Sequence, residues 1–387
     1  MNGSWHSPPV FAVDTSLSWL LGASFAETCP SPPEGEGTRV LSLARRLEIS
    51  GRVAERLRRI GRPRLTVLEA ELDTDYQTNL AVDAQLGHAL EHVAGIAAEQ
   101  AVPVIALKYA ALHLSGISRV GTRVAGDLDF LVPAAAIARL WQALLDAGYV
   151  RAGTRAHAHQ LEALVGPFGA VVELHRHLPG VCVARQRFAT ADDLFEASLV
   201  EPLASSTLWS PQPAVLAAHA LAHGLLQNRH TPQSYSLLRM LSDLVDLRTA
   251  HTGSALVASA AYCSPSLIGA SKTAERLCSV LQRGMVSSAE FVGTAEQRLL
   301  WHCLAARLDA DYARQLRLSP LFGAIGDSAG VSARLSYLVG ALFPTEHELD
   351  AIYGPAGSIP ARVRRRLMRP LDLGMRLARY WSRSRRL

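Results

Sequence analysis

The chain has 387 residues, a formal net charge of +5 and five cysteines. Its hydrophobic content of 49% and charged content of 19% are those of a folded globular protein and exclude a disordered one. The length exceeds a usual single core, so we expect two or three cooperating subdomains. The modest positive charge favours anionic ligands only weakly.

The cysteine pattern and the apolar runs both bear on the cellular compartment. The cysteines are odd in number and never form a C-x-x-C pair, which argues against a disulfide framework or a zinc ribbon. The apolar run 17–25 has no Lys or Arg before it, so it lacks the basic region of a signal peptide. No apolar run approaches the roughly 18 residues of a transmembrane helix. We therefore expect a cytoplasmic protein without a transmembrane segment.

The chain divides into four predicted parts. Residues 1–37 form an N-terminal extension with one short helix at 15–26. Apolar residues recur at helical spacing over 38–100, which predicts a helical preface. Residues 101–200 carry the predicted strands. Residues 201–387 are predicted to form a helical C-terminal domain with a basic tail.

The strand-bearing part predicts an α+β fold with a small mixed sheet. In chain order its expected elements are a strand at 102–107, a helix at 109–116, a strand at 127–132, a helix at 137–147 that ends at Gly148, and a hairpin of strands at 157–164 and 170–177.

Two acidic residues share one side of the strand at 127–132. Because side chains alternate along a strand, Asp127 and Asp129 point to one face and Leu128 and Phe130 to the other. The two acids lie roughly 6 to 7 Å apart along the backbone, close enough to converge on one divalent cation. The alternative is a solvated edge strand, since such a short motif also arises by chance.

Basic and glycine residues precede these acids. The chain has lysine only at Lys108 and Lys272, and Lys108 follows a buried apolar run, where an ammonium can meet a phosphate. Gly121 allows a turn whose backbone can approach a ligand, and Arg123 could reach a triphosphate. A solvated loop arginine is the alternative for Arg123.

The hairpin supplies a third acid. Glu173, His175 and His177 fall on one face of its second strand. His175 could orient Glu173 or contact a phosphate, or it could be a structural histidine. His159 on the first strand alternates correctly to line the same hairpin face, together with His157, but we expect both to be exposed.

Several of these segments together resemble a known family. The pattern L-K-x-x-A-L, then G-x-R-x-x-x-D-L-D-x-L-V, then V-E-L-H, resembles the uncharacterised bacterial nucleotidyltransferases of the DNA-polymerase-β-like superfamily. The likeness covers roughly residues 60–380. Further matching segments are His219 and His223 in H-x-x-x-H, Asp243, Leu342-Phe343-Pro344 and Tyr353-Gly354.

The resemblance implies a catalytic core at 101–200 and a set of roles. Asp127, Asp129 and Glu173 would bind Mg²⁺ or Mn²⁺ and carry catalysis. Nucleotide contacts would come from Lys108, Gly121, Arg123 and His175. The implied reaction moves a nucleoside monophosphate from an NTP, with ATP expected, to a hydroxyl or phosphate of a peptide, protein, sugar or small molecule, and releases pyrophosphate.

One difference from the family pattern leaves a second function possible. The family usually has glycine after the lysine, where this chain has Tyr109, whose ring could narrow the approach of the nucleotide or stack on its base. A noncatalytic module that binds a nucleotide or a partner is therefore the alternative function.

The helical C-terminal part offers weaker candidates. His219 and His223 lie one helical turn apart, but without an obvious third ligand we favour a place in the wall of the cleft over a zinc site. Asp243 is expected to be an interhelical partner or to support the site. The stretch 362–386 is predicted to be a packed basic helix, with contact to an anionic surface as the alternative, and we expect no stable nucleic-acid complex.

Overall fold

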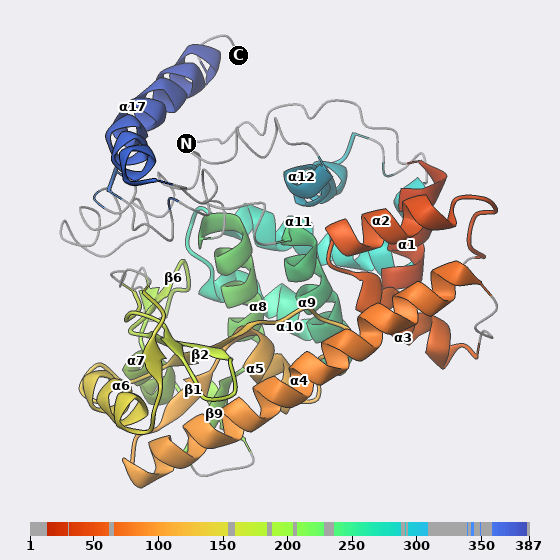
Figure 1. Cartoon of the computed structure of the whole chain (residues 1–387). Helices are drawn as coiled ribbons and strands as arrows, with labels where there is room; N and C mark the ends of the chain where they lie inside the picture. Colours follow the sequence, from red (N-terminus) through yellow and green to blue (C-terminus); the bar gives the residue numbers. More distant parts are fainter. Residues whose placement is uncertain are drawn as a thin grey trace.

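The fold is seen in a computed structural model. It describes residues 14–29, 31–61, 66–153, 159–183, 188–203, 207–227, 236–287, 291, 293–308, 339, 342–343, 349 and 358–384. The helices within residues 15–59 lie at one end of the molecule and the sheet at the other, and the long helix at 67–99 runs between them (Figure 1).

The N-terminal helices precede the sheet, as the helical spacing predicts. They are α1 (Thr15–Phe25), α2 (Gly37–Arg46), α3 (Ser50–Arg59) and α4 (Val67–Glu99). Helix α4 has 33 residues and is therefore about 50 Å long. It starts at a capping box, in which Thr66 and Glu69 each accept a hydrogen bond from the other's backbone N–H. Its length links the α1–α3 end to the sheet.

Seven of the described strands form one mixed sheet in the order β3-β4-β5-β2-β1-β9-β8. Their bounds are β1 (Val104–Ala106), β2 (Asp127–Leu131), β3 (Val150–Arg151), β4 (Leu164–Val165), β5 (Val171–His175), β8 (Val200–Pro202) and β9 (Leu208–Pro211). Strands β6 (Leu178–Pro179) and β7 (Phe188–Ala189) pair separately. The predicted α+β class with a mixed sheet is confirmed.

The central pairing brings β2 beside β5. These strands are parallel, with Asp129 opposite Glu173 and Leu131 opposite His175. Strand β1 is antiparallel to β2 and parallel to β9. The sequence did not predict β8 or β9, so the sheet continues past residue 200, where the strand-bearing part was expected to end.

Short helices flank the sheet. They are α5 (Lys108–Leu114), α6 (Ile137–Asp146) and α7 (Ala191–Glu196). Helix α6 ends as predicted, because Gly148 adopts φ +90° just after it. The hairpin of β4 and β5 is present, with a first strand that is shorter than predicted; His157 lies outside the described residues.

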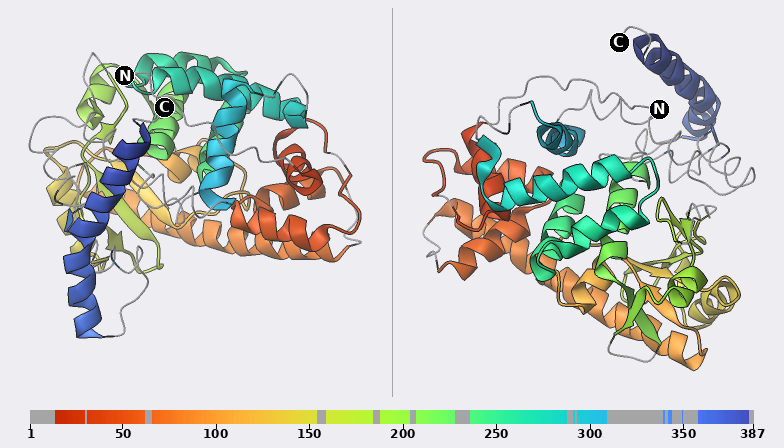
Figure 2. Two further views of the ribbon diagram at one scale, coloured as in Figure 1. Left: turned by 90° about the horizontal axis from the view of Figure 1, so that it is seen from above. Right: turned by 180° about the vertical axis from the view of Figure 1, so that it is seen from behind.

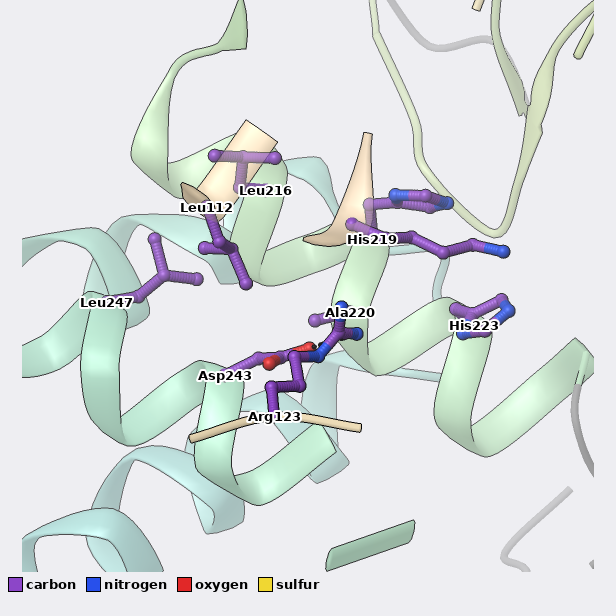
Figure 3. Close-up of a pocket in the computed structure, with 9 residues that line it drawn as sticks. Leu112, Arg123, Leu216, His219, Ala220, His223, Asp243 and Leu247 are labelled. Carbon is purple, nitrogen blue, oxygen red and sulfur yellow. Dashed lines mark hydrogen bonds and ion pairs between the residues drawn. The ribbon is translucent and has the colours of Figure 1, made fainter. Parts of the chain in front are cut away.

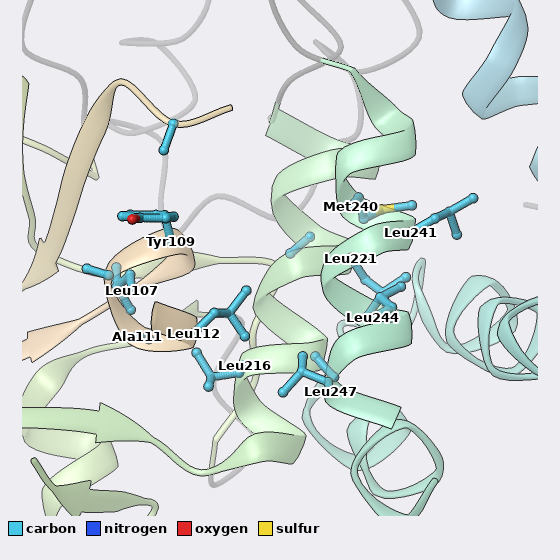
Figure 4. Close-up of a cluster of buried hydrophobic side chains, with 14 of the residues drawn as sticks. Leu107, Tyr109, Ala111, Leu112, Leu216, Leu221, Met240, Leu241, Leu244 and Leu247 are labelled. Atoms are coloured by element: carbon cyan, nitrogen blue, oxygen red, sulfur yellow. The ribbon is translucent and has the colours of Figure 1, made fainter. Parts of the chain in front are cut away.

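The C-terminal part is helical. Its elements are α8 (Pro213–Ala222), a π-helical turn at His223–Gln227, α9 (Leu237–Ala250), α10 (Ser254–Ser259), α11 (Ile268–Gln282), α12 (Ala295–Leu308) and α17 (Ile359–Ser384). Leu107 and Leu112 of the α5 segment pack with Leu216 of α8 and Leu247 of α9 in a buried apolar cluster (Figure 4). This contact fixes α5, and with it Lys108, against the helical part.

Helix α17 lies apart from the other described elements in the front and rear views (Figures 1 and 2). Within the described part of the chain, no helix combines the length and apolar character that crossing a bilayer requires.

Candidate active site

The site is built on the face of β2 and β5 that carries their acids. Leu128 and Phe130 point to the opposite face and are no more than 1% exposed, so the core holds β2 firmly in place. Val172 and Leu174 do the same for β5. The parallel register then sets Asp129 beside Glu173, the juxtaposition on which the sequence interpretation depends.

Lys108 reaches this face from the start of α5. Its Nζ lies 2.7 Å from Oδ1 of Asp129, and the two side chains are only 10% and 1% exposed. Lys108 adopts φ +47°, a left-handed conformation that is costly for a residue with a side chain. The buried ion pair therefore sits on a strained backbone.

His175 completes the group around Asp129. Its Nε2 lies 2.8 Å from the same oxygen, Oδ1 of Asp129, and 3.7 Å from Oε2 of Glu173. The histidine thus lies closer to Asp129 than to Glu173, which was one of the two groups it could contact by prediction. Its ring is 3% exposed and stacks on His159 with centroids 5.8 Å apart.

These contacts shift the pKa values of Asp129 and Glu173 in opposite directions. Burial alone would raise the pKa of Asp129, but Lys108 and His175 hold that pKa well below its usual range. Burial and then the charge of Asp129 raise the pKa of Glu173 to about 7. Burial alone would lower the pKa of Lys108, but the negative charges of Asp129, Asp127 and Glu173 raise that pKa above its ordinary value. Asp129 is thus a fixed anion, whereas Glu173 can take or release a proton near neutrality.

The ligand set suits a divalent cation. Asp129, Glu173 and His175 each offer one atom, and these atoms lie within 4.8 Å of one another. Carboxylate oxygens suit Mg²⁺ and Mn²⁺, and an imidazole extends the set toward transition metals. The ammonium of Lys108 already occupies a cationic position against Asp129, which shows that this spot favours positive charge.

Asp127 stands at the start of β2, opposite Val171. It is half-buried and is not one of the three clustered ligands. Its charge nevertheless contributes to raising the pKa of Lys108 and Glu173, so it lies within electrostatic reach of both. Its direct contact with a metal stays a prediction.

Arg123 is held by the helical part of the chain. Its Nη2 lies 3.0 Å from Oδ2 of Asp243, and both side chains are less than 10% exposed. Its guanidinium lies 5.7 Å from the ring centre of Tyr109. The alternative of a solvated loop arginine is therefore wrong. Tyr109 is itself only 3% exposed, so its ring does not offer the open face that stacking on a base requires.

Gly121 is clamped to helix α4. Its N–H donates to Oδ2 of Asp83 at 2.6 Å, and its carbonyl accepts from Asn79. It adopts φ +75°, and a Cβ there would lie 2.5 Å from the ring of Tyr76. Only glycine fits this turn. A contact between Gly121 and a nucleotide stays a prediction.

His219 and His223 line a narrow pocket next to Lys108 (Figure 3). Its cavity volume is about 10 Å³, the size of a single water site. Burial and then the charge of Lys108 lower the pKa of His219 to about 3 and that of His223 well below its usual range. Both imidazoles are therefore neutral. Among the described residues, neither belongs to a group of three metal ligands.

The sequence did not point to Asn79 and Asp83, which hold Gly121, and it gave a wrong prediction for the exposure of His159. Asn79 and Asp83 were not singled out, although they stand at helical spacing between the apolar residues Leu72 and Leu86 of α4, where an unpartnered polar residue would be costly. His159 was expected to be exposed, but it is 8% exposed because its ring packs on His175.

One of three comparisons with known proteins gives a match. A family model described as an uncharacterised nucleotidyltransferase matches residues 33–260, more than half of the chain. The match contains the site but ends well before residue 380, where the resemblance was expected to end. Of the segments beyond it, Pro344 and Tyr353-Gly354 lie outside the described residues. Comparison with the curated proteins and with the solved structures gave no match. The chain belongs to this uncharacterised nucleotidyltransferase family.

Proposed function

We propose that the protein is a metal-dependent nucleotidyltransferase. It would transfer a nucleoside monophosphate from an NTP, with ATP as the first candidate, to a hydroxyl or phosphate of a peptide, protein, sugar or small molecule. The observation that carries the proposal is the parallel pairing that sets Asp129 beside Glu173, with Lys108 and His175 on the same carboxylate. A fold of the DNA-polymerase-β-like type is part of the proposal.

The metal would be held by Asp129, Glu173 and His175, with Asp127 as a further ligand. A divalent cation there supplies charge neutralisation for the triphosphate and for the departing pyrophosphate. The donor set supports Mg²⁺ or Mn²⁺.

The residues of the chain then have distinct tasks. The acceptor oxygen forms a bond to the α-phosphorus while the bond to the bridging oxygen of pyrophosphate breaks. Glu173, which lies opposite Asp129 in the sheet, is suited to take the proton of the acceptor hydroxyl. Lys108 is suited to meet the negative charge of the phosphates.

Arg123 and Gly121 support the site from the loop that precedes β2. In the structure Arg123 donates to Asp243, and Gly121 donates to Asp83. We therefore assign the direct phosphate contact first to Lys108. Through these contacts Arg123 and Gly121 would hold the loop that leads into β2. A direct contact of either residue with the nucleotide remains part of the proposal.

The test is release of pyrophosphate and transfer of label from NTPs in the presence of Mg²⁺ or Mn²⁺ and candidate acceptors. Asp129→Asn and Glu173→Gln should each abolish transfer. Asp192→Asn is the matched control, because Asp192 is an exposed acid on α7 and should leave transfer unchanged. Transfer that survives in both site variants would contradict the proposal.

The same assay separates the alternative, a noncatalytic nucleotide-binding module, which Tyr109 in place of glycine keeps open. Metal-dependent binding of the NTP without any release of pyrophosphate would favour that alternative.

A further inference from the structure

Helix α17 has its apolar side chains on the outside. A helix of a folded protein normally turns such residues toward the core. The exposed fractions along it are 74% for Ile359, 51% for Val363, 69% for Leu367, 45% for Met368 and 61% for Leu371. The least exposed positions of the same segment include Arg365 and Arg369. The apolar side chains of α17 are thus more exposed than these two arginines.

The exposed apolar residues form one continuous stripe. Ile359, Val363, Leu367 and Leu371 follow one another at intervals of four residues. At about 100° per residue, each step of four advances only about 40° around the helix axis. The stripe therefore covers a single face, which some apolar partner must cover if it is to leave water.

The charges beside the stripe indicate the kind of partner. Exposed Arg364 and Arg366 stand on its two sides, about 100° and 60° from Val363. Residues 359–384 contain eight arginines and one acidic residue, Asp372. Long arginine side chains can lay their stems on an apolar layer while their guanidinium groups reach anionic groups above it. Such an arrangement matches the boundary between acyl chains and anionic headgroups.

We infer that α17 lies in the surface of a bilayer that contains anionic lipids. The stripe enters the acyl boundary, and the flanking arginines contact lipid phosphates. A nucleic acid would use the arginines but leave the stripe in water. A second copy of α17 would cover the stripe but would bring the two sets of flanking arginines together. The bilayer is the partner that accounts for both features.

Sedimentation of the full chain with vesicles tests the inference. The chain should sediment with vesicles of phosphatidylglycerol and phosphatidylcholine, and much less with phosphatidylcholine alone. Leu367→Ser with Leu371→Ser should reduce binding about tenfold or more without changing net charge. The control is Val67→Ser with Val257→Ser, which alters two exposed valines on α4 and α10 and should leave binding unchanged.

A second pair of variants tests the charges. Arg364→Gln with Arg366→Gln should weaken binding to the anionic vesicles, and added salt should weaken binding of the unchanged chain. Failure to sediment with anionic vesicles would overturn the inference. So would binding that the two leucine substitutions leave intact, equal retention on duplex DNA, or a self-association of the chain that those substitutions abolish without any vesicle binding.

Discussion

Replacing Lys108 by methionine should destabilise the protein in the absence of metal and leave a defect that a divalent cation repairs. The ion pair joins Nζ of Lys108 to Oδ1 of Asp129 at 2.7 Å, and both side chains are at least nine-tenths buried. At an effective dielectric constant of about 20 the gross attraction is about 6 kcal/mol. Breaking a buried pair costs about 3 to 5 kcal/mol, and because His175 remains on Asp129 we expect a loss near the lower value.

The assay is urea unfolding of Lys108→Met and of the unchanged chain, in EDTA and then in Mn²⁺. The gap in unfolding free energy should shrink with Mn²⁺, because the cation replaces the positive charge that the substitution removes from beside Asp129. Lys272→Met is the control, since Lys272 is exposed on α11 and is the only other lysine in the chain. A variant as stable as the parent in EDTA, or one that Mn²⁺ does not restore, would refute the reasoning.

Three further predictions concern the same region. The affinity for Mn²⁺ should rise about tenfold per pH unit up to pH 7 and then level off. The reason is that the pKa of Glu173 is raised to about 7 and the metal binds the deprotonated carboxylate. Binding calorimetry across this pH range should show a flatter profile for Glu173→Gln than for the unchanged chain. Arg123→Met should lower the free energy of unfolding by about 3 kcal/mol, because it leaves the buried carboxylate of Asp243 without this partner. Adding Asp243→Asn to the same chain should recover most of that loss. If the losses of the two substitutions simply add, Arg123 and Asp243 do not interact. Burial lowers the pKa of His219 from 6.5 to about 3, so between these pH values the unfolded state binds more protons than the folded state. The free energy of unfolding should therefore fall as the pH drops below 6.5, by about 2 kcal/mol from this group at pH 5. Unfolding curves of His219→Gln measured across that pH range should lack this loss.

Local pattern was enough to find the acids and the strands that carry them. Asp127 and Asp129 alternate with apolar residues over the four positions 127–130, and in the second strand Glu173 and His175 alternate with Val172 and Leu174. Both periods are properties of neighbouring residues, so they are visible in the sequence. The end of α6 at Gly148 was visible for a similar reason, since the helix needs a left-handed residue there.

Pairings between distant segments could not be predicted in the same way. The contact between Arg123 and Asp243 joins residues 120 positions apart, and no local period marks it. Strand β9 has only four residues, and its place in the sheet comes from pairing with β1. The burial of His159 depends on the ring of His175 across the hairpin. Each of these features is decided by tertiary packing, which overrides local preference.

The pairing of β2 with β5 ties the integrity of the site to that of the core. If β5 slipped by one residue along β2, Val172 or Leu174 would take the place beside Asp129, and the carboxylate of Glu173 would turn into the apolar layer. A length change in the β4–β5 turn should therefore not yield a well-folded but inactive protein. Loss of the reaction centre and loss of the native fold should occur together in such a chain.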